Sequence, residues 1–120
     1  MDVESIRNYC LSQKGVTESF PFDEETLVFK VLGKMFALLS LEKFEIGEGS
    51  INLKCDPEWS IQLREEYESI TPGYHMNKQH WNTVIVQNSD IKPNFLKELI
   101  DHSYQLVFKS LPKKIRESLD

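Results

Sequence analysis

The chain has 120 residues, with 14 Lys and Arg against 19 Asp and Glu, and a formal net charge of −5. Hydrophobic residues make up 40% of it and charged residues 28%, with 5 Gly and 5 Pro, which excludes the collagen-like and intrinsically disordered classes. Domains commonly contain about 100–150 residues, so we expect residues 1–120 to form a single domain.

The sequence predicts neither a membrane span nor a disulfide framework. The longest apolar run, Met35 to Leu39, is far shorter than the roughly 18 residues that a membrane helix needs. The stretch from Met1 to Glu4 is acidic and polar, unlike the start of a signal peptide. Cys10 and Cys55 show no metal-binding spacing, and we expect two reduced thiols packed as small hydrophobes. These features predict a cytoplasmic protein without a membrane partner.

The first half of the chain predicts a helix followed by three strands. Asp2 is a suitable N-cap for a helix that runs to about Lys14 and stops at Gly15. Residues 26–32 alternate between apolar and polar side chains, and the turn at Gly33-Lys34 predicts that residues 35–41 return as an antiparallel partner. Residues 42–49 are charged and contain glycine, which favours a loop, and residues 51–55 alternate again as a third strand.

The second half predicts three helices and one or two strands. Asp56-Pro57 has the cap and the proline that begin a helix. A strand near Tyr74 is weakly indicated, and residues 82–87 form a clear strand. Pro93 fits the first position of a long helix, and Pro112 begins a short one that ends near Leu119. The expected fold is therefore α+β and two-layered, an antiparallel sheet of about five strands with helices on one side, in the order α-β-β-β-α-β-β-α-α.

Charge is unevenly distributed along the chain. Residues 1–69 carry 7 basic and 14 acidic side chains, whereas residues 70–120 carry 7 basic and 5 acidic ones. The cations of the stretch 109–116 have no acidic residue among them. They could form a local surface for nucleic acid. The alternative, which we favour from sequence, is a solvated helix end that accommodates positive charge.

The segment from His75 to Trp81 contains the most unusual side chains. His75 and His80 could ligate a metal or transfer protons, but no third ligand stands at a recognisable spacing. The interpretation that we favour is structural, with His75, Asn77 and His80 hydrogen-bonded to the loop backbone. Lys78 beside Trp81 could meet a phosphate and stack on a base. The alternative is a Trp81 packed in the core next to a solvated lysine.

The segment 72–84, with the sequence PGYHMNKQHWNTV, resembles the signature of the MmcQ/YjbR family. Supporting matches follow in order along the chain: FPF at 20–22, VFKV at 28–31, GKMFA at 33–37, LKCDP at 53–57 and SYQLV at 103–107. The resemblance implies an α+β fold related to CyaY-like and secretion-chaperone architectures. It also implies DNA binding through a double wing of β-hairpins, and it supplies no catalytic residues.

The lysines of the first strands are the corresponding candidates for phosphate contacts. Alternation places Lys30 and Lys54 on the faces opposite the apolar residues of their strands, and Lys34 lies at a hairpin tip. The double-wing resemblance makes this hairpin our candidate wing, although lysines on a sheet also prevent edge-to-edge aggregation.

Searches for nucleophile, phosphate-loop and metalloprotease motifs are negative. We therefore expect a non-enzymatic protein without cofactor or metal, and the resemblance implies that it binds double-stranded DNA, weakly and in a salt-dependent way. The alternative is a module that binds a protein partner or a second copy of itself, and a third hypothesis is a small-ligand pocket around His75, His80 and Trp81.

Overall fold

A single antiparallel sheet of six strands organises the molecule, and the computed structural model describes residues 1–119 of it. The strands lie in the order β1-β2-β3-β4-β6-β5, so β6 is inserted between β4 and the edge strand β5. The strands are β1 (Val16–Ser19), β2 (Thr26–Val31), β3 (Lys34–Ser40), β4 (Ser50–Lys54), β5 (Ile70–Pro72) and β6 (Trp81–Ile85).

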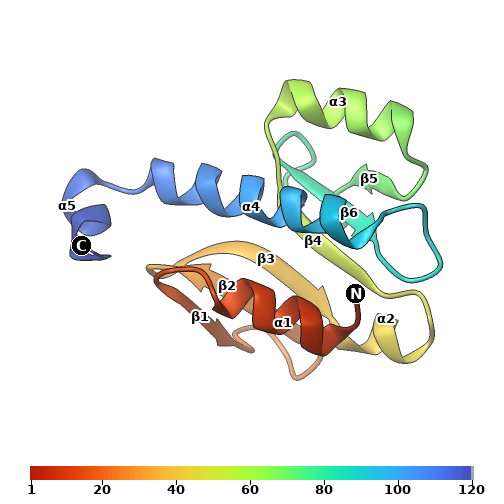
Figure 1. The fold of residues 1–120 in the computed structure, drawn as a ribbon, viewed down its shortest axis with the longest axis horizontal. Coiled ribbons are helices and arrows are strands. Elements are labelled where there is room, and N and C mark those ends of the chain that lie inside the picture. The colour runs from red at the N-terminus through yellow and green to blue at the C-terminus, as the bar shows by residue number, and fades with distance from the viewer. Residues whose placement is uncertain (120) are drawn as a thin grey trace.

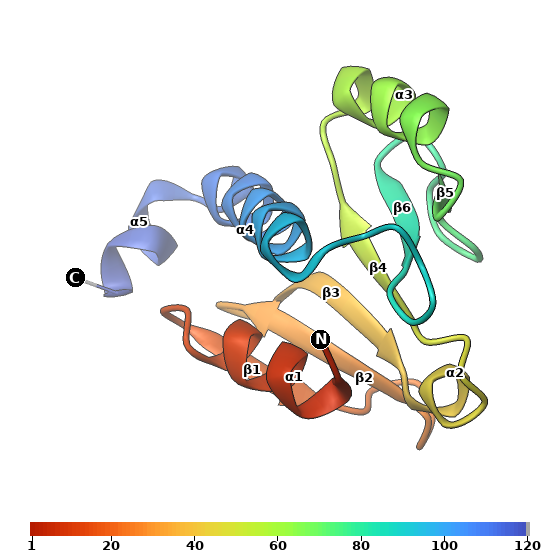
Figure 2. The same ribbon diagram turned by 45° about the vertical axis from the view of Figure 1, so that its right-hand side comes forward.

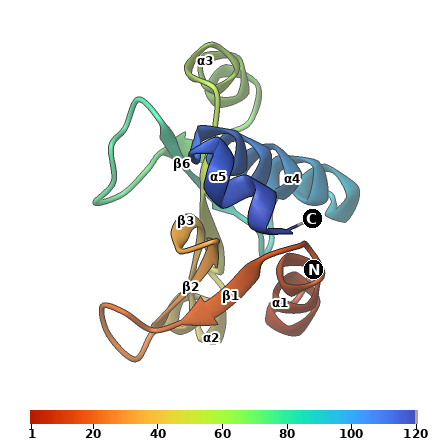
Figure 3. The same cartoon turned by 90° about the vertical axis from the view of Figure 1, so that its left-hand side faces the viewer.

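Helices cover one face of this sheet and leave the other face open. Figure 3 shows α1 and α4 on one side of the strands, with α3 at the end formed by β5 and β6. The helices are α1 (Val3–Leu11), α2 (Leu41–Glu45), α3 (Pro57–Glu66), α4 (Pro93–Ser110) and α5 (Lys113–Arg116), followed by the 3₁₀ turn η1 (Glu117–Leu119) (Figure 1). The expected α+β class with one helical layer is confirmed. Within residues 1–119, none of the helices is long and apolar enough to span a membrane.

The helix starts follow from local hydrogen bonding. The carboxylate of Asp2 accepts a hydrogen bond from the backbone N–H of Ser5, and that of Asp56 accepts from Glu58. Each aspartate thereby satisfies a backbone donor that the first turn leaves free. Pro93 begins α4, where its missing N–H costs nothing.

The main core lies between the sheet and the helices. Alternate residues of the strands point into it, such as Phe29 in β2 and Ile51 in β4, and both are fully buried. From α4, Ile100 and Val107 pack against this face at helical spacing. Burial of apolar surface at about 25 cal/mol per Å² is the main driving force for such a layer.

A β-bulge at Phe36 changes the alternation of β3. Phe29 pairs with Ala37 but Lys30 pairs with Met35, so Phe36 is an extra residue between them. Phe36 therefore lies on the helix side together with Ala37, and its ring packs edge-on against Tyr104 of α4, with 5.5 Å between centroids.

Ser103 of α4 ties the helix to the sheet beside this bulge. Its hydroxyl donates to the Phe36 carbonyl at 2.6 Å and accepts from the Lys54 N–H at 2.9 Å. Ser103 is fully buried. It thus satisfies one backbone group on each of two neighbouring strands, which water cannot do at this position.

Two elements are absent from our sequence prediction. β1 has the pattern Val-Thr-Glu-Ser, in which no residue is fully buried, so the apolar alternation that identifies a strand is too weak to detect. Residues 41–45 form α2, because the Ser40 hydroxyl caps it and Phe44 is buried; we expected residue 41 to end a strand and residues 42–49 to form a loop. The weak strand expected near Tyr74 lies instead at residues 70–72, and the sheet has six strands rather than about five.

We predict that Ser103→Ala destabilises the protein by about 1–3 kcal/mol, because it leaves buried backbone groups without a partner. Urea unfolding followed by circular dichroism measures this difference. Ser118→Ala is the matched control, since its hydroxyl bonds the Ile115 carbonyl at the surface. Equal stability of the two variants would show that the Ser103 hydroxyl is not required.

Candidate functional site

The β2–β3 turn and the end of α4 meet at one end of the molecule. The ammonium nitrogen of Lys34 donates to the hydroxyl of Ser110 at 2.9 Å. Figures 1 and 2 show the β2–β3 turn, the end of α4 and α5 gathered at the same end of the fold. The hairpin tip that we identified from sequence therefore lies beside the basic stretch 109–116.

The C-terminal turn of the chain is packed onto this same end. A Cβ placed on Gly15, in the turn between α1 and β1, would stand 3.0 Å from the Leu119 side chain. This contact holds α5 close to the sheet. Lys113 and Lys114 are exposed, and Lys113 forms an i,i+4 pair with Glu117 at 3.9 Å. Such an exposed pair contributes little and leaves the ammonium group available to other anions.

Lys30 and Lys54 lie on the open face of the sheet, close to this end. Lys30 pairs with Met35 in β3, and Lys54 pairs with Trp81 in β6. Partial burial lowers the pKa of Lys54, and the positive charge of Lys34 lowers it further. The two ammonium groups are therefore close enough to repel each other. We call Lys30, Lys34, Lys54, Lys109, Lys113 and Lys114 the basic end.

Trp81 lies in a small apolar cluster on the open face. It packs with Val28 and Leu38, next to Met35 and Met76, and only 9% of its surface is exposed. This burial favours the core interpretation of Trp81 and leaves little of the indole for stacking on a base. Lys78 is exposed in the preceding loop.

Hydrogen bonds to the backbone shape the loop from Gly73 to His80. The side-chain oxygen of Asn77 accepts from the Gln79 N–H at 2.9 Å, and the Asn77 carbonyl accepts from the Trp81 N–H at 2.9 Å. The His80 carbonyl accepts from the Cys55 N–H at 2.8 Å. Arg64 of α3 donates to the Lys78 carbonyl and so fixes the loop from the other side.

The two loop histidines are placed differently. His75 is exposed, has a left-handed backbone with φ of 59°, and its ring lies 4.0 Å from that of Tyr74. His80 is half-buried at the start of β6. Across residues 1–119, no three His, Cys, Asp or Glu side chains are grouped so that they could hold a metal ion.

A large groove occupies the open face of the sheet. Its volume is about 1120 Å³, and its floor is formed by β3, β4 and β6. Two loops flank it: residues 20–25 between β1 and β2, and residues 73–80 between β5 and β6. Figure 3 shows both loops extending away from the helices, on the open side of the sheet. Phe22 and Tyr74 line the groove from these loops, and they are 64% and 70% exposed.

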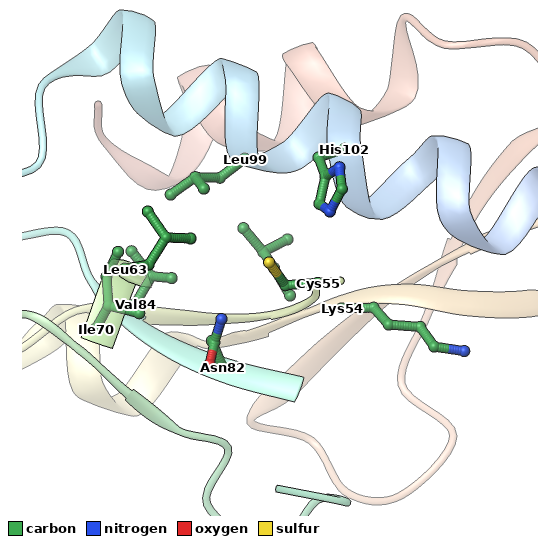
Figure 4. A pocket seen from close by; sticks show the side chains of 9 residues that line it. Lys54, Cys55, Leu63, Ile70, Asn82, Val84, Leu99 and His102 are labelled. Carbon is green, nitrogen blue, oxygen red and sulfur yellow. The ribbon is translucent and has the colours of Figure 1, made fainter. Parts of the chain in front are cut away.

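A second cavity between the sheet and the helices is too small for a ligand. Its volume is about 10 Å³, enough for about one water molecule. Figure 4 shows His102 reaching from α4 toward Cys55, with Asn82 below and Lys54 directed away. Burial raises the pKa of the Cys55 thiol, so we assign this cluster to the core rather than to chemistry.

A network of polar side chains lies beside this small cavity. Asn82 is buried; its amide donates to the Ser60 hydroxyl at 3.1 Å and accepts from Arg64 at 2.8 Å. His102 accepts from the Asp56 N–H at 3.1 Å, and its ring meets Trp59 edge-on. These bonds fix α3 and α4 against β6.

Comparison with known proteins identifies the family. The YjbR family model matches residues 11–106. The chain belongs to the YjbR family. It is 40% identical over 111 residues to YbdF of Escherichia coli O157:H7, covering 92% of this chain and 88% of YbdF. It is 29% identical over 119 residues to YjbR of Escherichia coli K12, covering 99% of this chain and 98% of that protein.

Two solved structures share the fold of this chain. Protein DR2400 of Deinococcus radiodurans, described with a DUF419 family domain, superposes with a TM-score of 0.88 at 40% identity. The match covers 98% of this chain and 87% of DR2400. A Pseudomonas syringae protein, target PsR293, superposes with a TM-score of 0.74 at 30% identity, covering 89% of this chain and 99% of that protein.

Sequence reasoning placed a small-ligand pocket around His75, His80 and Trp81, whereas the groove of this YjbR-family chain is lined by His75 but not by the other two. Alternation does place Asn52 and Thr83 opposite the buried residues of their strands, which indicates an open face. It does not show that β6 lies next to β4 or that two loops far apart in sequence flank the same surface. Phe22 and Tyr74 belong to those loops, and their positions depend on the strand order.

We predict that the imidazole of His102 titrates below its ordinary pKa of 6.5, because burial disfavours its charged form, although Asp56 and Glu98 act in the opposite direction. The unfolded chain then binds more protons below about pH 6.5, so the folded state loses stability as the pH falls through that range. Proton NMR of the ring measures the midpoint.

His102→Gln should lose less stability than the wild type between about pH 7.5 and about pH 5.5. A midpoint for His102 at or above 6.5 would contradict the burial argument.

Proposed function

We propose that this YjbR-family protein binds nucleic acid through phosphate contacts made by the basic end. The hydrogen bond between Lys34 and Ser110 is the observation on which the proposal depends. It brings the hairpin lysines together with those of the C-terminal helix. Several lysines on one surface are what a duplex-binding protein requires, because each neutralised phosphate releases counterions.

The electrostatics of the basic end support an anionic partner. Burial lowers the pKa of Lys54, and the nearby positive charge of Lys34 lowers it further. A phosphate placed between two such ammonium groups would replace their repulsion with attraction. Lysine acts here as a point charge, so we expect contacts with the backbone of the nucleic acid and little reading of base sequence.

The proposed role is binding rather than catalysis, and we place it in the cytoplasm. Cys10 and Cys55 are free and buried, which is typical of proteins in a reducing compartment. Burial raises the pKa of Cys10 to about 12, so this thiol is unreactive at neutral pH.

A second function, binding of a protein partner or a second copy, is favoured by two exposed side chains. Phe20 and Phe22 are 47% and 64% exposed in the same loop. Exposed aromatic residues are enriched at protein interfaces. A dimer in sedimentation experiments, abolished by Phe20→Ala, would support this function in place of DNA binding.

We predict that the double variant Lys34→Gln, Lys114→Gln binds a labelled DNA duplex about tenfold more weakly at low salt. Its plot of log affinity against log salt concentration should be less steep by about 1.8, because each phosphate that is no longer neutralised reduces the slope by about 0.9. Fluorescence anisotropy at several salt concentrations measures both quantities.

The matched control is Lys43→Gln, Lys92→Gln, which removes the same charge from positions outside the basic end. It should bind like the wild type. Equal weakening of the two double variants would show that net charge rather than the basic end determines binding, and absence of wild-type binding at low salt would reject the proposal.

A further inference from the structure

We propose that the groove on the open face of the sheet binds an uncharged, planar heteroaromatic ring compound. The groove lies on the same face as Lys30 and Lys54 but shares no lining residue with the basic end, and this inference does not rest on the proposed function. Its volume of about 1120 Å³ is slightly above the range of about 300–1,000 Å³ that is common for small-molecule sites, so it has room for a ring compound. The inference depends on the aromatic side chains at the rim, on the charges and on the polar groups of the floor.

The rim of the groove offers two aromatic surfaces. Phe22 and Tyr74 lie on the two flanking loops, and most of each ring is exposed. Exposed aromatic side chains on a concave surface provide faces on which a planar ring can stack. Met35, Leu38 and Ile85 add apolar area between the loops.

The charges that line the groove are of mixed sign. The carboxylate of Asp23 accepts from the N–H groups of Glu25 and Thr26, which holds the first loop in shape. Lys43 forms an exposed ion pair with Glu48 at 3.9 Å, so these two opposite charges lie close together. The groove therefore presents no field of one sign that would select an anion or a cation, whereas a neutral ligand needs none.

The floor supplies uncharged hydrogen-bonding groups. Asn52 and Thr83 lie side by side on β4 and β6, and the Thr83 hydroxyl donates to the Asn52 carbonyl oxygen at 2.6 Å. This bond fixes the Asn52 side chain and leaves its NH₂ group able to donate to a ligand. The same hydroxyl accepts from the Tyr74 N–H at 3.1 Å, which links the floor to the second loop.

The rim is also conformationally constrained. His75 and Asn88 line the groove with φ of 59° and 51°, in the left-handed region that side chains rarely adopt. The Asn88 side chain donates to the Gly47 carbonyl at 3.2 Å. This bond ties Asn88 to the turn after α2 before any ligand arrives, and a preformed rim favours binding.

The test is a nitrogen-15 NMR titration with three uncharged ring compounds: adenosine, nicotinamide and riboflavin. Glucose, which is uncharged and has no aromatic ring, and inorganic phosphate are the control probes. We expect at least one ring compound to give saturable shifts of the Asn52, Thr83 and Tyr74 amides, and neither control probe to do so. If none of the three ring compounds shifts these amides, or if phosphate shifts them equally, the proposal is wrong.

The double variant Phe22→Ala, Tyr74→Ala should bind the ring compound at least tenfold more weakly, because both stacking surfaces are removed. The two rings are largely exposed, so the variant should keep the wild-type spectrum elsewhere. Ile61→Ala, a truncation of a side chain on α3 that is 59% exposed, is the matched control and should bind like the wild type. Unchanged binding by the double variant would overturn the proposal.

A heteroaromatic ring can come from a free compound or from an unpaired base of a nucleic acid. Titration with a single-stranded oligo(dA) separates these sources. If shifts of the same amides show that oligo(dA) binds more tightly than adenosine, the ligand is a base within a nucleic acid. If oligo(dA) binds equally or more weakly, the ligand is a free compound. Failure of the basic end to bind duplex DNA would leave this result unaffected, because the three ring compounds carry no phosphate diester.

Discussion

The buried hydroxyl of Ser103 fixes how the long helix α4 lies on the sheet. It bonds to the Phe36 carbonyl and to the Lys54 N–H beside the bulge. The bulge in turn directs Phe36 toward α4 and Met35 toward the open face. With α4 held in this position, its last turn reaches the β2–β3 hairpin, where Ser110 meets Lys34. The basic end therefore depends on a contact in the middle of the helix as well as on its own residues.

The net charge of −5 does not describe the charge distribution on the surface, because carboxylates and lysines occupy different kinds of position. Asp2 and Asp23 accept backbone hydrogen bonds at a helix start and in a loop, and these bonds lower the pKa of each. Glu18 bonds Arg7, which also lowers its pKa. These three acidic groups thus stabilise local structure and remain charged at neutral pH, whereas six of the eleven lysines gather at one end. An acidic chain can in this way present a basic surface.

The parts of the fold that local chemistry determines could be predicted from the sequence. The caps at Asp2 and Asp56 and the alternation of β2, β3 and β4 have short-range signals. β1 has no such signal, because it is a short edge strand without a fully buried residue. For the candidate sites, Lys30 and Lys54 could be identified from alternation, Lys34 from the hairpin turn, and the lysines of 109–114 from a stretch without acidic residues. The contact between the hairpin and the end of α4 depends on packing between distant segments. The position of Phe22 and Tyr74 at the rim of one groove depends on the strand order.

The fold carries two separate surfaces: a basic end for phosphates and an uncharged groove for a planar ring. The most direct test is to map a short DNA duplex onto the protein by nitrogen-15 NMR at low salt. We expect the shifts to concentrate at Lys34, Lys54 and residues 109–114 and to decrease as salt is added. Shifts confined to the floor of the groove at Asn52 and Thr83, or shifts that do not respond to salt, would contradict this assignment of the two surfaces.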